Sequence, residues 1–237
     1  MKQFLILLCC IYGGLVHSQE IEYLEKNDTL QKPKYIQFIY ISDSTNLSTT
    51  KYVAKVKATG SLRNVTNLFL FLKAEAQKIG ANSFRVDSFK RVDSLNGELI
   101  LSMYYIDEES DFFDVNFENL PKHKIYIFGN QNMVDAKTQS YKVNGEKHEI
   151  ESGKFAVFEI KPDEEVKINK GGFAGMTLWV KRKAEGFSSF LNFSGIGLNG
   201  ANYNPNGGVG VSFNTGTINK IEPNLALALL KIYSQQQ

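Results

Sequence analysis

The chain has 237 residues, with 27 Lys and Arg against 25 Asp and Glu, so its formal net charge is +2. This balance excludes a polycation that would bind nucleic acid through its phosphates. A hydrophobic content of 43% with 12% aromatic residues excludes a disordered or low-complexity chain. Two cysteines and three histidines are too few for a disulfide scaffold or a cysteine-based metal site.

Residues 1–18 have the pattern of a secretory signal peptide. Lys2 supplies the positive start, an apolar run extends from Phe4 to Val16, and Ser18 is the small residue at the break. The run is too short for a membrane-spanning helix, which needs about 20 apolar residues. We therefore predict export, to the periplasm, the cell surface or the extracellular space, and a mature chain without a transmembrane segment. Both cysteines lie in the leader, so the mature chain would contain no thiol.

Residues 19–106 contain two kinds of periodicity, which together predict an α+β domain. Residues 20–34 are mixed polar and predict an exposed arm. Segments rich in β-branched and aromatic residues predict four strands, at 35–41, 51–58, 83–87 and 98–106. Between the second and third strands, apolar residues recur every three or four positions and predict a helix over 62–79. The expected fold is a small antiparallel sheet with one helix on its face, in the order ββαββ.

The end of the predicted helix carries a distinctive sequence. Gly80 can adopt the left-handed conformation that ends a helix. The run Ala76-Gln77-Lys78-Ile79-Gly80-Ala81-Asn82, followed by Phe84-Arg85-Val86, resembles small bacterial envelope domains of the YbjQ/Rcs-sensor type, and the resemblance extends over about residues 51–106. It implies a helix-end packing signature. The metal or disulfide of some such domains is not implied, because the mature chain has no cysteine and this segment has no histidine.

Residues 107–121 are rich in carboxylates and predict an acidic linker. A calcium site is the alternative, but the ligand alternation and central glycine of a calcium loop are missing. Phe112, Phe113 and Phe117 are expected to attach this linker to a neighbouring surface, and they are our first candidate contact residues.

Residues 122–237 predict a β-sandwich domain, because short strands are separated by turn signals at nearly regular spacing. The strands are expected at 124–128, 141–143, 147–150, 155–160, 165–168 and 176–180. Asn144-Gly145 is the strongest hairpin signal. Trp179, in the last of these strands, is expected to be buried. The tail from Pro223 to Tyr233 predicts a C-terminal helix, with a strand as the alternative.

The order of strands and turns over about residues 124–168 resembles a family of short envelope β-sandwiches of unknown function. The residues that carry it are Val143-Asn144-Gly145, Gly153-Lys154-Phe155 and Pro162-Asp163, where Asp163 replaces the glycine usual in the family. The resemblance implies fold and compartment, and it implies no activity.

A glycine-rich segment is the one named chemical motif in the chain. Gly195-Ile196-Gly197-Leu198-Asn199-Gly200-Ala201 matches the dinucleotide-binding pattern, which needs a strand before it and a helix after it. The next residues include Pro205 and two glycines and cannot start a regular helix. We therefore interpret 195–216 as a loop without a cofactor, and its exposed polar residues are further candidate contacts: Asn199, Asn202, Tyr203 and Asn204.

The remaining chemistry is sparse, and we predict no catalytic residue, no cofactor and no metal. His123 and His148 do not form a zinc-ligand spacing, and no Gly-x-Ser-x-Gly elbow is present. The first hypothesis is an exported bacterial envelope protein that acts as a non-enzymatic binding or interaction module, with another envelope protein or a glycan as partner. The alternative is a hydrolase that acts on envelope polysaccharide through paired carboxylates about 5–10 Å apart. A third is a ligand-carrying sandwich with an enclosed apolar cavity.

Overall fold

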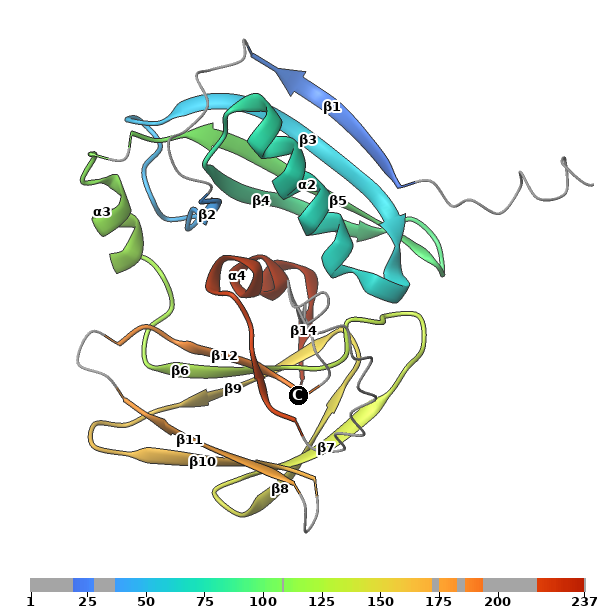
Figure 1. The fold of residues 1–237 in the computed structure, drawn as a ribbon, viewed down its shortest axis with the longest axis vertical. Coiled ribbons are helices and arrows are strands. Elements are labelled where there is room, and N and C mark those ends of the chain that lie inside the picture. Colours follow the sequence, from blue (N-terminus) through green and yellow to red (C-terminus); the bar gives the residue numbers. More distant parts are fainter. Residues whose placement is uncertain are drawn as a thin grey trace, which may run out of the picture.

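Figure 1 shows the computed structural model of the chain, which describes residues 19–27, 37–107, 109–171, 175–182, 186–193 and 217–236. It is a mixed α/β structure made mostly of strands, and these residues form three sheets and three α-helices. The expected signal peptide and the expected loop at 195–216 lie outside this part of the chain. Within it, no helix has the length and apolar character needed to cross a membrane.

The first sheet has five strands in the order β1-β3-β5-β4-β2. Their bounds are β1 (Glu20–Lys26), β2 (Ile39–Tyr40), β3 (Lys51–Ser61), β4 (Ser83–Arg91) and β5 (Asn96–Tyr105). β5 is central, as its apolar residues on both faces predict, and it pairs antiparallel with β3 and β4. β2 differs from the expected antiparallel arrangement, because it pairs parallel to β4. A short 3-10 helix, η1 (Leu62–Asn64), and helix α2 (Thr66–Ile79) connect β3 to β4.

The N-terminal segment differs from the exposed arm that its polarity predicts. Glu20–Lys26 forms edge strand β1, with Ile21 and Tyr23 half-buried against the sheet and the residues between them exposed. An edge strand buries one face only, so it needs few apolar residues and resembles an arm in sequence. The observed order of elements therefore adds a strand in front of the expected ββαββ.

Two glycines lie at the two ends of the segment formed by η1 and α2: Gly80 follows α2, and Gly97 packs against Leu62 of η1. Gly80 has φ 78° and ends α2, as predicted. Gly97, predicted to form a turn with Asn96, lies instead within β5, where a Cβ atom would approach Leu62 Cδ2 to 2.6 Å. The turn comes earlier, where the Asp93 carboxylate accepts hydrogen bonds from the backbone N–H groups of Leu95 and Asn96.

The remaining strands form two facing sheets. The four-stranded sheet has the order β11-β10-β7-β8, with β7 (Thr138–Val143), β8 (Glu146–Glu151), β10 (Glu165–Lys170) and β11 (Met176–Lys181). The five-stranded sheet has the order β13-β12-β6-β9-β14, with β6 (Lys124–Phe128), β9 (Lys154–Glu159), β12 (Ser189–Asn192), β13 (Asn219–Lys220) and β14 (Ser234–Gln235). Buried residues of both sheets, including Ile127 and Ile168, form one cluster between them, so the arrangement is sandwich-like.

The predicted turns of these sheets have the backbone conformations that their residues suggest. Asn144 and Gly145, between β7 and β8, have φ 51° and 92°, which is the pattern of a type I′ hairpin. Asp163, in the predicted turn after Pro162, has φ 59°. Asp tolerates this conformation better than most other residues do, so it suits this turn.

The C-terminal helix joins the two halves of the molecule. α4 (Pro223–Ile232) confirms the predicted helix, and it lies between the first sheet and the five-stranded sheet (Figure 1). Its ends are fixed to the five-stranded sheet, because β13 precedes it and β14 follows it. Its buried side chains share a cluster with α2 and the first sheet, and with Phe128 and Phe190 of the five-stranded sheet. The first sheet ends at Tyr105 and the other two begin at Lys124, whereas one buried cluster contains residues of both parts.

Two buried tyrosines make the stability of both halves sensitive to alkaline pH. Burial raises the pKa of Tyr40 and of Tyr141 to about 12, from an ordinary value of 10.0. Both hydroxyls must stay neutral in the folded chain, so their contribution is complete below pH 10 and is lost as the pH rises from 10 towards 12. The free energy of unfolding should fall there by at most about 1.4 kcal/mol per pH unit for each tyrosine.

Denaturant titrations between pH 8 and pH 12 measure this slope. Tyr141→Phe should flatten the decline, because a phenyl ring has no proton to lose. An equal slope in the variant and the parent chain would contradict the assignment.

Candidate functional site

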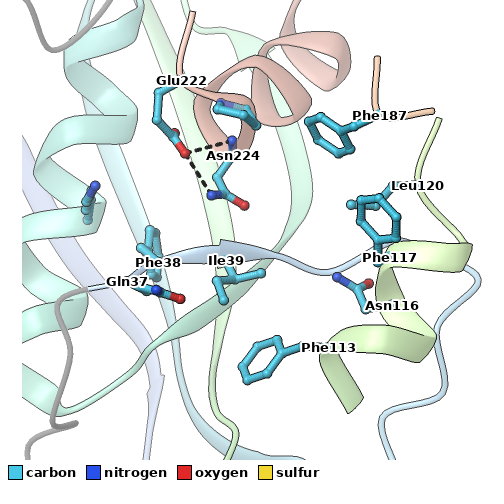
Figure 2. A pocket seen from close by; sticks show the side chains of 12 residues that line it. Gln37, Phe38, Ile39, Phe113, Asn116, Phe117, Leu120, Phe187, Glu222 and Asn224 are labelled. Atoms are coloured by element: carbon cyan, nitrogen blue, oxygen red, sulfur yellow. Dashed lines mark hydrogen bonds between the residues drawn. The ribbon is translucent and has the colours of Figure 1, made fainter. Parts of the chain in front are cut away.

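A groove of about 540 Å³ lies where α3 (Phe112–Glu118), β2, α2 and the start of α4 meet (Figure 2). Seven of the twelve residues that line it are apolar. The walls are mainly aromatic and aliphatic side chains from distant parts of the chain: Phe38, Ile39, Phe113, Phe117, Leu120 and Phe187.

α3 occupies the segment that was expected to be an acidic linker. The Asn116 side chain holds it in place: the amide oxygen accepts from the Ser42 N–H and the Thr45 hydroxyl, both at 2.9 Å. The amide nitrogen donates to the Tyr40 carbonyl at 2.8 Å. Phe112 on the same helix packs into a buried cluster with Ile41. The helix is therefore anchored on one side, and its other side forms a wall of the groove.

The aromatic walls are partly preorganised by ring contacts. Phe117 of α3 stacks on Phe187, with ring centroids 5.6 Å apart and planes 17° apart. Phe38, at the opposite side, stacks on Phe84 at 4.4 Å. Rings held by such contacts lose little conformational freedom when a ligand arrives, so the groove offers a rigid apolar surface.

Most polar groups in the walls are already hydrogen-bonded. The Glu222 carboxylate caps α4 by accepting from the backbone N–H of Asn224 at 3.1 Å and of Leu225 at 2.8 Å, and it also accepts from the Asn224 side-chain amide. The Asn224 amide oxygen accepts from the Tyr40 N–H at 2.9 Å. Lys73 is the one cation of the lining, and within the described residues its ammonium has no ion-pair partner. The groove therefore requires few hydrogen bonds from what it binds.

The predicted contact residues have different outcomes. Phe113 and Phe117 line the groove, whereas Phe112 is only 6% exposed and cannot be a contact residue, because it packs into the core beneath α3. Asn199, Asn202, Tyr203 and Asn204 lie outside the described residues. Phe187 and Asn116 were missed.

The prediction that Trp179 is buried is wrong, since it is 54% exposed. β11 is an edge strand in which Val180 faces the core. The period of two then places Trp179 on the outer face. An apolar run such as Leu178-Trp179-Val180 does not reveal from sequence alone which set of alternate residues faces inward.

His148 and the carboxylate of the groove have structural contacts in the described residues. His148 packs between the rings of Tyr141 and Phe158, at centroid distances of 5.5 and 5.2 Å. No group of three or more His, Cys, Asp or Glu side chains there has the geometry to hold a metal ion. The groove contains a single carboxylate, that of Glu222, and its oxygens are already used as a helix cap.

Comparison with protein families, with curated proteins and with solved structures finds no match for this chain. The two envelope-family resemblances of residues 51–106 and 124–168 therefore stay predictions.

Proposed function

We propose that the chain is an exported, non-enzymatic binding module, and that its groove between α3 and α4 takes a small apolar or aromatic ligand. The two facing sheets then serve as a β-sandwich scaffold behind the groove, next to the α+β unit. The observation that supports this proposal is the groove itself, which has a volume of about 540 Å³ and aromatic walls. This volume is in the size range of small-molecule sites. The proposed export rests on the leader pattern of residues 1–18.

The chemistry of the walls selects an apolar ligand. Asn116, Asn224 and Glu222 have their hydrogen-bonding groups occupied within the protein. Apart from the Lys73 ammonium, a polar ligand would find few partners to replace the water it loses, which costs free energy. An apolar ring loses only unfavourable contact with water and gains contact with Phe117 and Phe187.

The hydrolase alternative needs two carboxyl groups in one cleft. The groove has one, and Glu222 cannot serve as a general acid or base without giving up the cap of α4. The geometry of the described residues therefore favours binding.

Binding of a neutral fluorescent probe, N-phenyl-1-naphthylamine, tests the proposal. The parent chain should bind it, and Phe117→Ala should weaken binding about tenfold, because one wall ring and its stack on Phe187 are lost. Val115→Ala is the matched control: Val115 belongs to the same helix but is 54% exposed and does not line the groove. Equal loss in both variants, or undiminished binding in Phe117→Ala, would contradict the proposal.

A further inference from the structure

Two further hollows lie at the open edge of the two facing sheets. One, of about 460 Å³, runs between β11 and β12 and continues to β13. The other, of about 170 Å³, lies beside it under His123. They share the lining residues Lys181, Ser188 and Ser189, so a single ligand can occupy both.

His123 is held in the smaller hollow in an unusual conformation. Its φ is 58°, a left-handed value uncommon for residues other than glycine. Two backbone hydrogen bonds fix it there, from its N–H to the Gly186 carbonyl at 2.7 Å and to its carbonyl from the Ile160 N–H at 2.9 Å. A Cβ atom on Gly186 would come within 2.0 Å of the imidazole Cε1. The ring therefore lies directly on the Gly186 backbone, and its Nδ1 is buried without a partner.

The charged residues that line the smaller hollow, within the described part of the chain, are all basic. Arg182 and Lys181 line the smaller hollow with His123, and no carboxylate among the described residues does. Lys181 pairs with Glu165 outside the hollow at 3.4 Å, between largely exposed side chains, and such a pair is weak. Within the described part of the chain, Arg182 and the Ser189 hydroxyl have no hydrogen-bond or ion-pair partner. A guanidinium and a hydroxyl with free donors are suited to an oxyanion.

The larger hollow adds an aromatic surface to this cationic end. Trp179 lines it and is 54% exposed, although Lys167 Nζ lies 5.0 Å from the ring centroid. Its other lining is mixed, with apolar Ile221 beside the Ser189 hydroxyl and the Lys220 ammonium, which has no ion-pair partner in the described part of the chain. The Glu222 carboxylate also lines it, and its oxygens are already used as the cap of α4. An amphipathic indole beside several hydrogen-bond donors suits a ligand with an apolar face and many polar edges. A sugar ring has this character.

We infer that the open edge of the facing sheets binds an acidic saccharide. Its carboxylate or sulfate would be held by Arg182 and Ser189 beside His123, and its ring would lie against Trp179. This site meets the apolar groove at Phe187, Glu222 and Pro223, which line both. None of the residues proposed to hold the saccharide, Arg182, Ser189 and Trp179, lines the groove. It goes beyond the function proposed above and can succeed or fail independently of it.

Titration of the amide and indole NMR signals with three probes tests the inference. Glucuronate should shift the Trp179 indole signal and the amides of residues 186–189, and glucose should bind at least about tenfold more weakly, because it lacks the carboxylate. Inorganic sulfate should shift the amides near Gly186 and leave the indole signal in place.

Two variants distinguish the cationic end of the site from its aromatic end, and a third is the control. Arg182→Ala should weaken both glucuronate and sulfate about tenfold, whereas Trp179→Ala should weaken glucuronate about tenfold and leave sulfate unchanged. Arg63→Ala is the charge-matched control, since Arg63 is exposed and pairs with Asp135. If Arg182→Ala disturbs folding, Ser189→Ala replaces it. Equal affinity for glucose and glucuronate, absence of binding by both anions, or an Arg182→Ala titration equal to that of Arg63→Ala would overturn the inference.

Discussion

Replacing Leu229 by alanine should destabilise both halves of the molecule together, by about 3 kcal/mol. Leu229 lies in α4 and is fully buried. It belongs to one cluster that contains β3, β4 and β5 of the first sheet as well as Tyr126 and Phe128 of β6. Truncation leaves a cavity in this shared core, and neither sheet can close it without moving against the other.

Native-state hydrogen exchange in increasing denaturant checks this expectation. Peptides from β5 and from β6 should lose protection at one denaturant concentration, and Leu229→Ala should lower that concentration equally for both. Leu230→Ala is the control, since the neighbouring side chain is only half-buried and should cost less. Separate transitions for β5 and β6 would show that the α+β unit and the facing sheets are independent domains.

The position of α4 shows what a sequence pattern can predict and what it cannot. Pro223 and the run of leucines and alanines predicted a helix, and the helix is there. Five successive residues, 225–229, are all buried, which indicates a helix covered on most sides. A pattern of this kind says that a helix is enclosed, but it does not say what encloses it. Much of the covering surface comes from β2, α2 and β4, which lie far earlier in the chain, and no local signal connects them to α4.

Local signals succeeded where backbone chemistry alone decides the outcome. Gly80 and Asn144-Gly145 adopt the positive φ angles expected of them, because few other residues tolerate that conformation. The predictions for β1 and for Trp179 failed where tertiary context decides, since edge strands bury little and their inward face depends on the partner.

The residues of the candidate groove were predictable only where a local sequence signal marked them. Phe113 and Phe117 stand out in an acidic segment, where aromatic rings have no local use, and so indicated a contact surface. Phe187 has no such signal: its stack on Phe117 is a tertiary contact, next to an isolated bridge between Lys122 and Phe187. Asn116 looked like one more polar linker residue, although it is 2% exposed and the most extensively bonded side chain of α3.

Asn116→Ala should therefore cost about 3 kcal/mol or more of unfolding free energy. The substitution leaves the Ser42 N–H and the Tyr40 carbonyl without their partner beneath α3, and the Thr45 hydroxyl loses its acceptor. Each buried group left unsatisfied costs about 1–3 kcal/mol. Because the whole chain is held by only about 5–15 kcal/mol, such a loss is measurable by urea unfolding.

Asn119→Ala tests whether the loss comes from burial. Asn119 has the same side chain at the end of the same helix and also bonds to Thr45, at 3.1 Å, but it is exposed. Water replaces its partners, so its substitution should cost less than about 1 kcal/mol. Asn116→Ala should also release α3 and weaken N-phenyl-1-naphthylamine binding, whereas Asn119→Ala should retain it. Equal stability of the two variants would mean that α3 is held by Phe112 alone, and the rigid wall on which the groove proposal depends would then lack its polar anchor.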